Sequence, residues 1–249
     1  MNELIIKMES KKGPEHSQIK QYALNGHSRP VKMVRYNTDG DMFFTCSDDK
    51  LIIAWSNEAA EKLGTYEGTG ACKSLDVSRH TEYIVGGYAV EGVSIYEAET
   101  GKEIYSFKPY ESADKVNYVE FNYGDTELLV LTNTSDNKSH IQLYDFQKLL
   151  NREKKVIKVF NFDFEVTQAS YGYLNETLYL STAKGDMKIV DIKSEKELIT
   201  SKVHAGHQIF SFTFSKDYSM LASCGKDGKC KLLHPNTLEV VKSYDKQAP

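Results

Sequence analysis

The feature that most constrains the fold is an internal period of 41 to 48 residues. Five strand-like runs end in an apolar or aromatic residue, and successive ends are 41, 48, 46 and 43 residues apart: Trp55, Tyr96, Tyr144, Val190 and Leu233. Each period holds four short runs rich in Val, Ile, Tyr and Phe, separated by turn signals at spacings too short for helices. Four strands per period are typical of a propeller blade, so the sequence predicts an all-β propeller.

The period divides the chain into a leader and a propeller domain. Five blades are predicted, approximately over residues 31–66, 72–107, 116–160, 166–203 and 209–244. An unmatched strand over residues 19–24 precedes them and is predicted to belong to the blade that closes the ring. Residues 1–18 are polar and show no periodicity, which predicts a flexible extension.

Composition excludes several classes of function. The 249 residues include 31 Lys and Arg against 35 Asp and Glu, a net charge of −4, so direct sequence-specific nucleic-acid binding is not expected. No apolar run reaches the roughly 20 residues that span a bilayer, and no signal peptide is present, which predicts a cytoplasmic protein without a membrane contact. The four cysteines include no CxxC pair, so we expect no metal site and no cofactor.

The first repeat carries a polar set made of His27, Ser47, Asp49 and Trp55. Asp49 lies six residues before Trp55 and Ser47 eight before it. In a blade these positions can join imidazole, hydroxyl, carboxylate and indole in one buried network, which offsets the desolvation of the carboxylate. The set resembles the structural tetrad of WD repeats. A catalytic Ser-His-Asp set uses three of the same residue types, but the spacing favours the structural interpretation.

The later repeats retain less of this set. Six residues before the strand-end marker, the second to fourth repeats have Val90, Lys138 and Lys184, and only the fifth keeps a carboxylate, Asp227. Its imidazole partner could be either His204 or His207. We predict that the three blades without the carboxylate depend on apolar packing between sheets.

Three motifs of the first repeat point to a narrower family. They are Gly26-His27-Ser28-Arg29-Pro30, Tyr36-Asn37-Thr38-Asp39-Gly40-Asp41 and Glu61-Lys62-Leu63-Gly64-Thr65-Tyr66. Together they resemble the first repeat of the i subunit of eukaryotic translation initiation factor 3. The resemblance extends over residues 19–249, with its strong motifs in the first repeat. An alternative is a WD-repeat adaptor of another assembly, similar to the serine-threonine kinase receptor-associated protein, but ordinary WD repeats do not require the Lys-Leu-Gly-Thr-Tyr run.

The resemblance implies a scaffold. Members of this family are seven-bladed, so five blades predict an incomplete ring, with closure of five blades on themselves as the alternative. The family's i subunit holds a C-terminal helix of the b subunit, contacts the g subunit and reaches the small ribosomal subunit through the complex. Ser211, Asp227 and Lys229 occupy fifth-blade positions near the expected helix and are candidate protein-binding residues. Asp227 could instead be the carboxylate of the structural network within its blade. Lys229 could instead be an ordinary solvated charge on the surface.

A propeller enzyme with a central site is the remaining class. Such a site requires His, Asp or Glu at equivalent positions of several blades. The seven histidines instead fall at different phases of the repeat: His16, His27, His80, His140, His204, His207 and His234. The sequence therefore predicts a non-catalytic protein.

Overall fold

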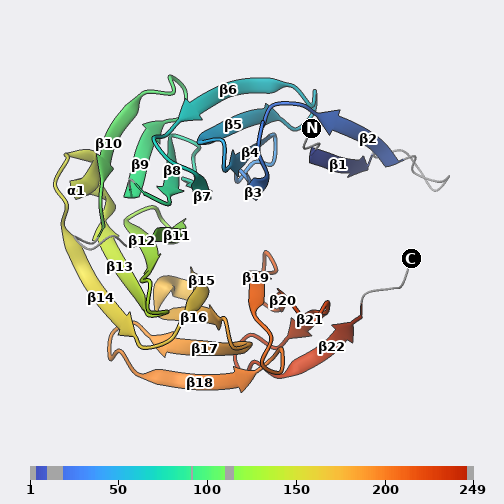
Figure 1. Cartoon of the computed structure of the whole chain (residues 1–249), viewed down its shortest axis with the longest axis vertical. Helices are drawn as coiled ribbons and strands as arrows, with labels where there is room; N and C mark the ends of the chain where they lie inside the picture. The colour runs from blue at the N-terminus through green and yellow to red at the C-terminus, as the bar shows by residue number, and fades with distance from the viewer. Residues whose placement is uncertain (1–3, 10–18, 91, 110–114, 246–249) are drawn as a thin grey trace. The chain divides into compact units, whose positions relative to one another are not determined.

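The computed structural model describes residues 4–9, 19–90, 92–109 and 115–245, which fold almost entirely into antiparallel strands. They divide into two compact units, Met1–Phe107 and Lys108–Pro249, and each is described by itself (Figure 1). Runs of β-branched and aromatic residues form the strands, and Gly, Asp and Asn in left-handed conformations form many of the turns, for example Gly40, Gly185 and Gly228.

The first unit contains two four-stranded sheets whose strands follow in chain order. Blade 1 consists of β3 (Val31–Tyr36), β4 (Met42–Ser47), β5 (Leu51–Ser56) and β6 (Lys62–Glu67). Blade 2 consists of β7 (Cys72–Val77), β8 (Tyr83–Tyr88), β9 (Gly92–Glu97) and β10 (Glu103–Phe107). The first strand of blade 2 packs on the first two strands of blade 1.

The second unit contains three such sheets. Blade 3 consists of β11 (Lys115–Phe121), β12 (Glu127–Asn133), β13 (Ser139–Asp145) and β14 (Val156–Phe162). Blade 4 consists of β15 (Val166–Tyr171), β16 (Thr177–Thr182), β17 (Asp186–Asp191) and β18 (Glu197–Lys202). Blade 5 consists of β19 (Ile209–Phe214), β20 (Leu221–Gly225), β21 (Cys230–Leu233) and β22 (Val240–Tyr244). A short helix, α1 (Phe146–Leu150), and a 3₁₀ turn, η1 (Tyr173–Asn175), lie in the connections.

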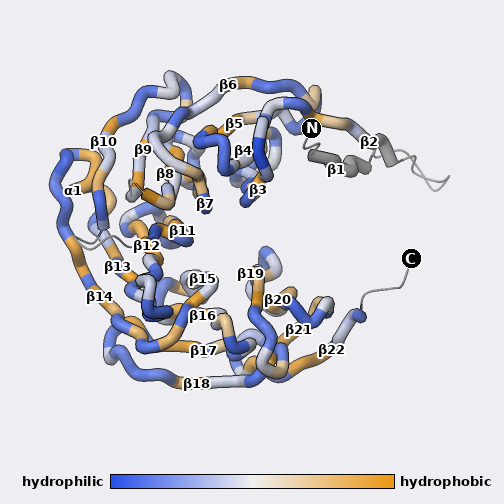
Figure 2. The backbone as a smooth tube through the Cα atoms, viewed as in Figure 1, coloured by the Kyte–Doolittle hydropathy of each residue, from blue (hydrophilic) through white to orange (hydrophobic). Residues whose placement is uncertain are grey.

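The core lies between neighbouring sheets. Hydrophobic residues recur along the strands and hydrophilic ones gather at the turns (Figure 2). Between blades 1 and 2, Phe44 and Ile52 pack with Leu75 and Ile84, all fully buried. Burial of this apolar surface is the main force that holds one blade on the next. The predicted all-β propeller with five four-stranded blades is confirmed, whereas the seven-bladed ring is not supported by the described chain, which has five.

The leader differs from its prediction. Leu4–Glu9 form a strand, β1, rather than part of a flexible extension, while residues 1–3 and 10–18 lie outside the described residues. Strand β2 (Ile19–Leu24) pairs antiparallel with β1, from Leu4 opposite Leu24 to Glu9 opposite Ile19. The prediction had assigned this strand to the blade that closes the ring, but its backbone partner is β1, and blade 5 has four strands of its own. The short apolar run at Ile5 and Ile6 has the β-branched composition of a strand.

Candidate functional site

A buried hydrogen-bond chain runs through blade 1. His27 precedes β3, Thr45 lies on β4 and Trp55 on β5. His27 Nδ1 lies 3.0 Å from Asp49 Oδ2, and its Nε2 lies 2.7 Å from the hydroxyl oxygen of Thr45. The Trp55 indole donates to the same hydroxyl oxygen at 2.8 Å. All bonds are satisfied when the threonine hydroxyl donates to Nε2 and the Nδ1 proton goes to Asp49.

Asp49 fixes two backbone segments as well as the imidazole. Its carboxylate accepts the Ser28 amide at 2.8 Å and the Leu51 amide at 3.1 Å. Burial opposes ionisation of this carboxyl, but the bonds from the Leu51 and Ser28 amides and from His27 outweigh burial and hold its pKa below the usual value. The carboxylate thus ties the loop before β3 to the β4–β5 turn.

The hydroxyl that joins the imidazole and the indole belongs to Thr45, not to Ser47 as the sequence predicted. Ser47 instead donates to the Arg29 carbonyl at 3.0 Å and accepts the Asp49 amide at 3.2 Å. Because Ser47 makes no bond to His27, the three residue types of a catalytic triad are present without its geometry.

Blade 5 contains a second imidazole–carboxylate pair. His204, whose side chain is fully buried, places Nδ1 2.9 Å from Asp227 Oδ1 and Nε2 2.9 Å from the Ser223 hydroxyl. His207 contributes no side-chain bond to this pair; its backbone amide donates to the His204 carbonyl. Leu233, opposite Leu221 as Trp55 is opposite Phe43, occupies the indole position. Of the two histidines left open by the sequence, His204 is the partner of Asp227.

In blade 2, two tyrosines occupy the position that the imidazole and its partners occupy in blades 1 and 5. Gly68 precedes β7 by four residues, as His27 precedes β3. The Tyr88 ring covers this position so closely that a Cβ on Gly68 would lie 2.1 Å from it. The Tyr88 and Tyr96 hydroxyl oxygens lie 3.0 Å apart, and Tyr96 donates to the Glu67 carbonyl at 3.2 Å. Burial raises the pKa of Tyr88 well above its ordinary value.

The three candidate protein-binding residues have different surroundings. The Ser211 hydroxyl donates to Gln168 Oε1 at 3.0 Å, which links blade 5 to blade 4. Asp227 binds His204 and accepts the Lys229 amide at 3.2 Å. Lys229 Nζ lies 2.9 Å from an Asp245 carboxylate oxygen, and this carboxylate raises the pKa of Lys229. The structure therefore brings Asp227 and Lys229 together and places Ser211 in a separate contact.

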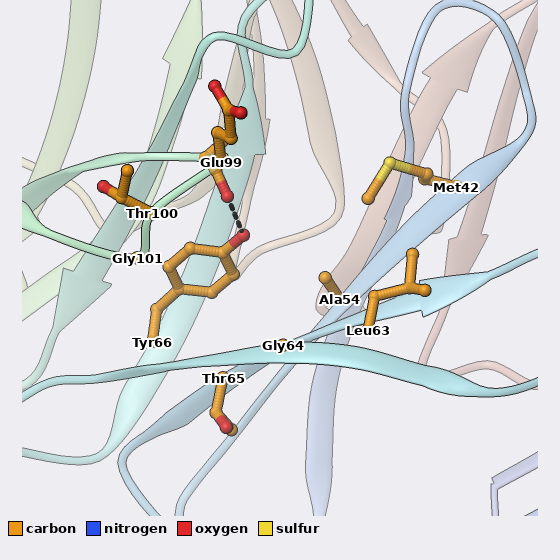
Figure 3. Close-up of a pocket in the computed structure, with 10 residues that line it drawn as sticks. Met42, Ala54, Leu63, Gly64, Thr65, Tyr66, Glu99, Thr100 and Gly101 are labelled. Atoms are coloured by element: carbon orange, nitrogen blue, oxygen red, sulfur yellow. Dashed lines mark hydrogen bonds between the residues drawn. The ribbon is translucent and has the colours of Figure 1, made fainter.

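A groove of about 350 Å³ lies beside β6 in the first unit (Figure 3). It is lined by Met42, Ala54, Leu63, Gly64, Thr65, Tyr66, Ala98, Glu99, Thr100 and Gly101. The Tyr66 hydroxyl closes one side by donating to the Ala98 carbonyl at 2.6 Å, the dashed line in Figure 3. The Leu-Gly-Thr-Tyr run that carries the family resemblance thus builds this groove. Its ionisable lining groups are the Glu99 carboxylate and the Tyr66 phenol, and Met42, Ala54 and Leu63 give it apolar surface.

The described ranges contain no group of three or more His, Cys, Asp and Glu that could hold a metal ion. Over those ranges there is also no helix with the length and apolar character needed to cross a membrane.

Comparison with known proteins relates these features to a family. The model of the WD domain, G-beta repeat, matches residues 18–56 and 196–233, the segments that contain the two imidazole–carboxylate pairs. Eukaryotic translation initiation factor 3 subunit I of Schizosaccharomyces pombe is 29% identical over 245 residues, covering 91% of this chain and 70% of that protein. The subunit from Dictyostelium discoideum is 28% identical (91% and 68% covered), and the human one 27% (93% and 71%).

A solved structure supports the same architecture. The β-propeller domain of Cps50 (Swd1) from Myceliophteria thermophila superposes with a TM-score of 0.72 at 16% identity, over 88% of this chain and 73% of that chain. At this identity the likeness shows the fold alone. From its repeats, its bonded His–Asp pairs and these relatives, we conclude that the chain is a β-propeller that contains two segments matching the WD domain and that is similar to eukaryotic translation initiation factor 3 subunit I over about nine-tenths of its length.

Proposed function

We propose that this protein is a non-catalytic scaffold subunit of a translation initiation factor 3 complex in the cytoplasm. The observation that carries the proposal is the 26–29% identity to subunit I of that factor in organisms as distant as a yeast, an amoeba and mammals, over 91–93% of the chain. The subunit acts during assembly of the initiation complex on the small ribosomal subunit, through contacts with other subunits.

The chemistry of the blades supports a scaffold rather than an enzyme. In both imidazole–carboxylate pairs the two ring nitrogens are already bonded inside their own blade, to Asp49 and Thr45 or to Asp227 and Ser223. The side chains of His27 and His204 are also 3% and 0% exposed, so a substrate in solution does not reach either imidazole. The same bonds fix the loops between strands, and rigid loops on a sheet scaffold are suited to binding other proteins.

We also propose that the partners include the b subunit, through a C-terminal helix, and the g subunit. Lys229 would contact the partner, because its side chain is about 43% exposed and its ammonium is held by Asp245 at the surface. Ser211 and Asp227 would act indirectly, since their side chains are bonded to Gln168 and His204. Lys229 is therefore the residue whose charge can be changed without breaking the interior of blade 5.

Purification of the tagged full chain from its own cells tests this function. We expect the b and g subunits to co-purify and the protein to sediment with small ribosomal subunits. Recovery of a different assembly, such as a receptor-kinase complex, without initiation factors would contradict the proposal. For the finer assignment, Lys229→Glu should reduce recovery of the b subunit while Lys226→Glu, a charge reversal at an exposed neighbour, should not. Equal recovery of the b subunit with both variants would show that Lys229 does not contact it.

A further inference from the structure

Three turns of the second unit present tyrosines at one end of successive blades. Tyr123 lies in the turn between β11 and β12, Tyr173 in the turn between β15 and β16, and Tyr218 in the turn between β19 and β20. Tyr123 and Tyr173 are 65% and 66% exposed, and the neighbouring Leu174 is 63% exposed. We call Tyr123, Tyr173, Leu174 and Tyr218 the tyrosine ledge. Isolated apolar residues on a surface are ordinary, but a contiguous set marks an interaction site.

Direct contacts join the three turns that carry the ledge. The Asn175 side chain accepts the Tyr123 amide at 3.0 Å and donates to the Tyr123 carbonyl at 2.9 Å, which joins the turns of blades 3 and 4. The rings of Tyr173 and Tyr218 meet edge to face, with centroids 5.7 Å apart, which joins blades 4 and 5. Tyr218 in turn packs on Phe214 at 5.0 Å. The surface is therefore held in place before any partner arrives, which lowers the entropy cost of binding.

The ledge is bordered by carboxylates. Glu176 is exposed beside Asn175, and Asp217 is exposed beside Tyr218. Hydrogen bonds from the Ser215 and Ser219 side chains and from the Ser219 amide lower the pKa of Asp217 to about 2, so this group is charged at neutral pH. The three turns carry one lysine, Lys216, against these carboxylates and that of Asp125. A phosphate backbone would be repelled here, whereas a cation would be attracted.

We propose that the tyrosine ledge is a docking site for an arginine-bearing segment of a protein partner. A guanidinium group stacks on an exposed tyrosine face and pairs with a carboxylate at the same time, which an ammonium does less well. Aliphatic residues of the segment would pack on Leu174. The turns at the corresponding position of blades 1 and 2, residues 37–41 and 78–82, contain no tyrosine, phenylalanine or tryptophan, so the site belongs to the second unit. The proposal concerns a surface and holds whatever complex the protein enters.

A random 12-residue peptide library displayed on beads tests the proposal with the purified full chain. We expect the chain to retain peptides enriched in arginine and aliphatic residues. For one retained peptide, Tyr173→Ala/Leu174→Ala should weaken binding by about tenfold or more, and Glu176→Lys by roughly fivefold, in fluorescence anisotropy. The matched control is Leu198→Ala, which removes a 56% exposed leucine from β18 of the same unit and should leave the affinity unchanged.

Three outcomes would overturn the proposal. The first is enrichment of acidic peptides or no enrichment. The second is an equal loss of affinity with Leu198→Ala, which would place the peptide elsewhere. The third is that the chain binds oligouridine RNA more tightly than the arginine peptide and that Tyr173→Ala/Leu174→Ala weakens this RNA binding. That result would identify the ledge as a nucleic-acid surface. Unchanged thermal unfolding of each variant shows that the fold persists. If a ledge variant loses peptide binding but still recovers the initiation factor subunits, the ledge is a site distinct from the one that binds those subunits.

Discussion

In blade 1 the imidazole of His27 lies between Asp49 and Thr45, and in blade 5 that of His204 lies between Asp227 and Ser223. The two blades differ at the next position, where blade 1 adds the Trp55 indole and blade 5 has Leu233. The shared part ties the loop before the first strand to the turn between the second and third. The imidazole, carboxylate and hydroxyl are therefore sufficient to join the loop to the turn. The Trp55 indole contributes additional packing in blade 1.

Loss of the carboxylate should have the largest effect. Asp49→Ala leaves His27 and the Ser28 and Leu51 amides without their acceptor, and we expect a loss of about 3–4 kcal/mol in the free energy of unfolding, measured with urea. Asp227→Ala removes an acceptor from only His204 and the Lys229 amide, so its loss should be smaller, about 2–3 kcal/mol. An unchanged unfolding midpoint for Asp49→Ala would refute the structural role of the carboxylate.

The indole can be removed by giving blade 1 the residue of blade 5. Trp55→Leu deletes a ring that stacks on Phe43, with centroids 6.1 Å apart, and leaves a cavity beside Gly26. We expect a loss of about 3 kcal/mol from packing, while the bond between Thr45 and His27 persists. Trp55→Phe keeps most of the ring and should lose roughly half as much. If both variants lost as much as Asp49→Ala, the indole would be an essential part of the link rather than an addition.

The two hydroxyls of β4 offer a sharper comparison. Thr45→Val keeps the shape of the side chain but leaves His27 Nε2 and the Trp55 indole without partners, and we expect a loss of about 2 kcal/mol. Ser47→Ala removes one bond to the Arg29 carbonyl and one from the Asp49 amide, with an expected loss of about 1 kcal/mol. Thermal and urea unfolding of the two variants check this order. A larger loss for Ser47→Ala would indicate that Ser47, rather than Thr45, supplies the main hydroxyl of the network.

The strands of blades 1 to 5 could be predicted because their pattern is local. Alternating β-branched and aromatic residues between turn signals specify a strand without knowledge of its neighbours. The shared hydroxyl was missed because Ser47 and Thr45 lie on the same face of β4, two residues apart. A comparison of the two blades carries the missing signal: Thr45 and Ser223 both lie four residues before their aspartate, whereas Gly225 stands where Ser47 does.

Other parts of the site depend on contacts that no local pattern records. The loop before β19 is one residue longer than the loop before β3, counted from His204 to Ile209 and from His27 to Val31, so counting alone could not choose between the two histidines. The tyrosine pair of blade 2 arises because Gly68 leaves room for the Tyr88 ring. These features combine segments that meet only in the folded blade.

Acidification should produce the smallest of these effects and compares the carboxylates of the two blades directly. In the folded protein hydrogen bonds hold the pKa of Asp49 and of Asp227 below the ordinary value, despite burial. A depressed pKa contributes stability above the unfolded value, near 3.9, and this stability is lost as pH falls through the folded pKa. The stability advantage of the wild type over Asp49→Asn should therefore be constant from about pH 7 to 5 and shrink below about pH 4.

For Asp227→Asn, the advantage of the wild type should decrease less on acidification, because Asp227 accepts one backbone amide where Asp49 accepts two. Urea unfolding at a series of pH values measures both differences, and an advantage that grew on acidification would mean that the carboxylates are protonated in the folded state.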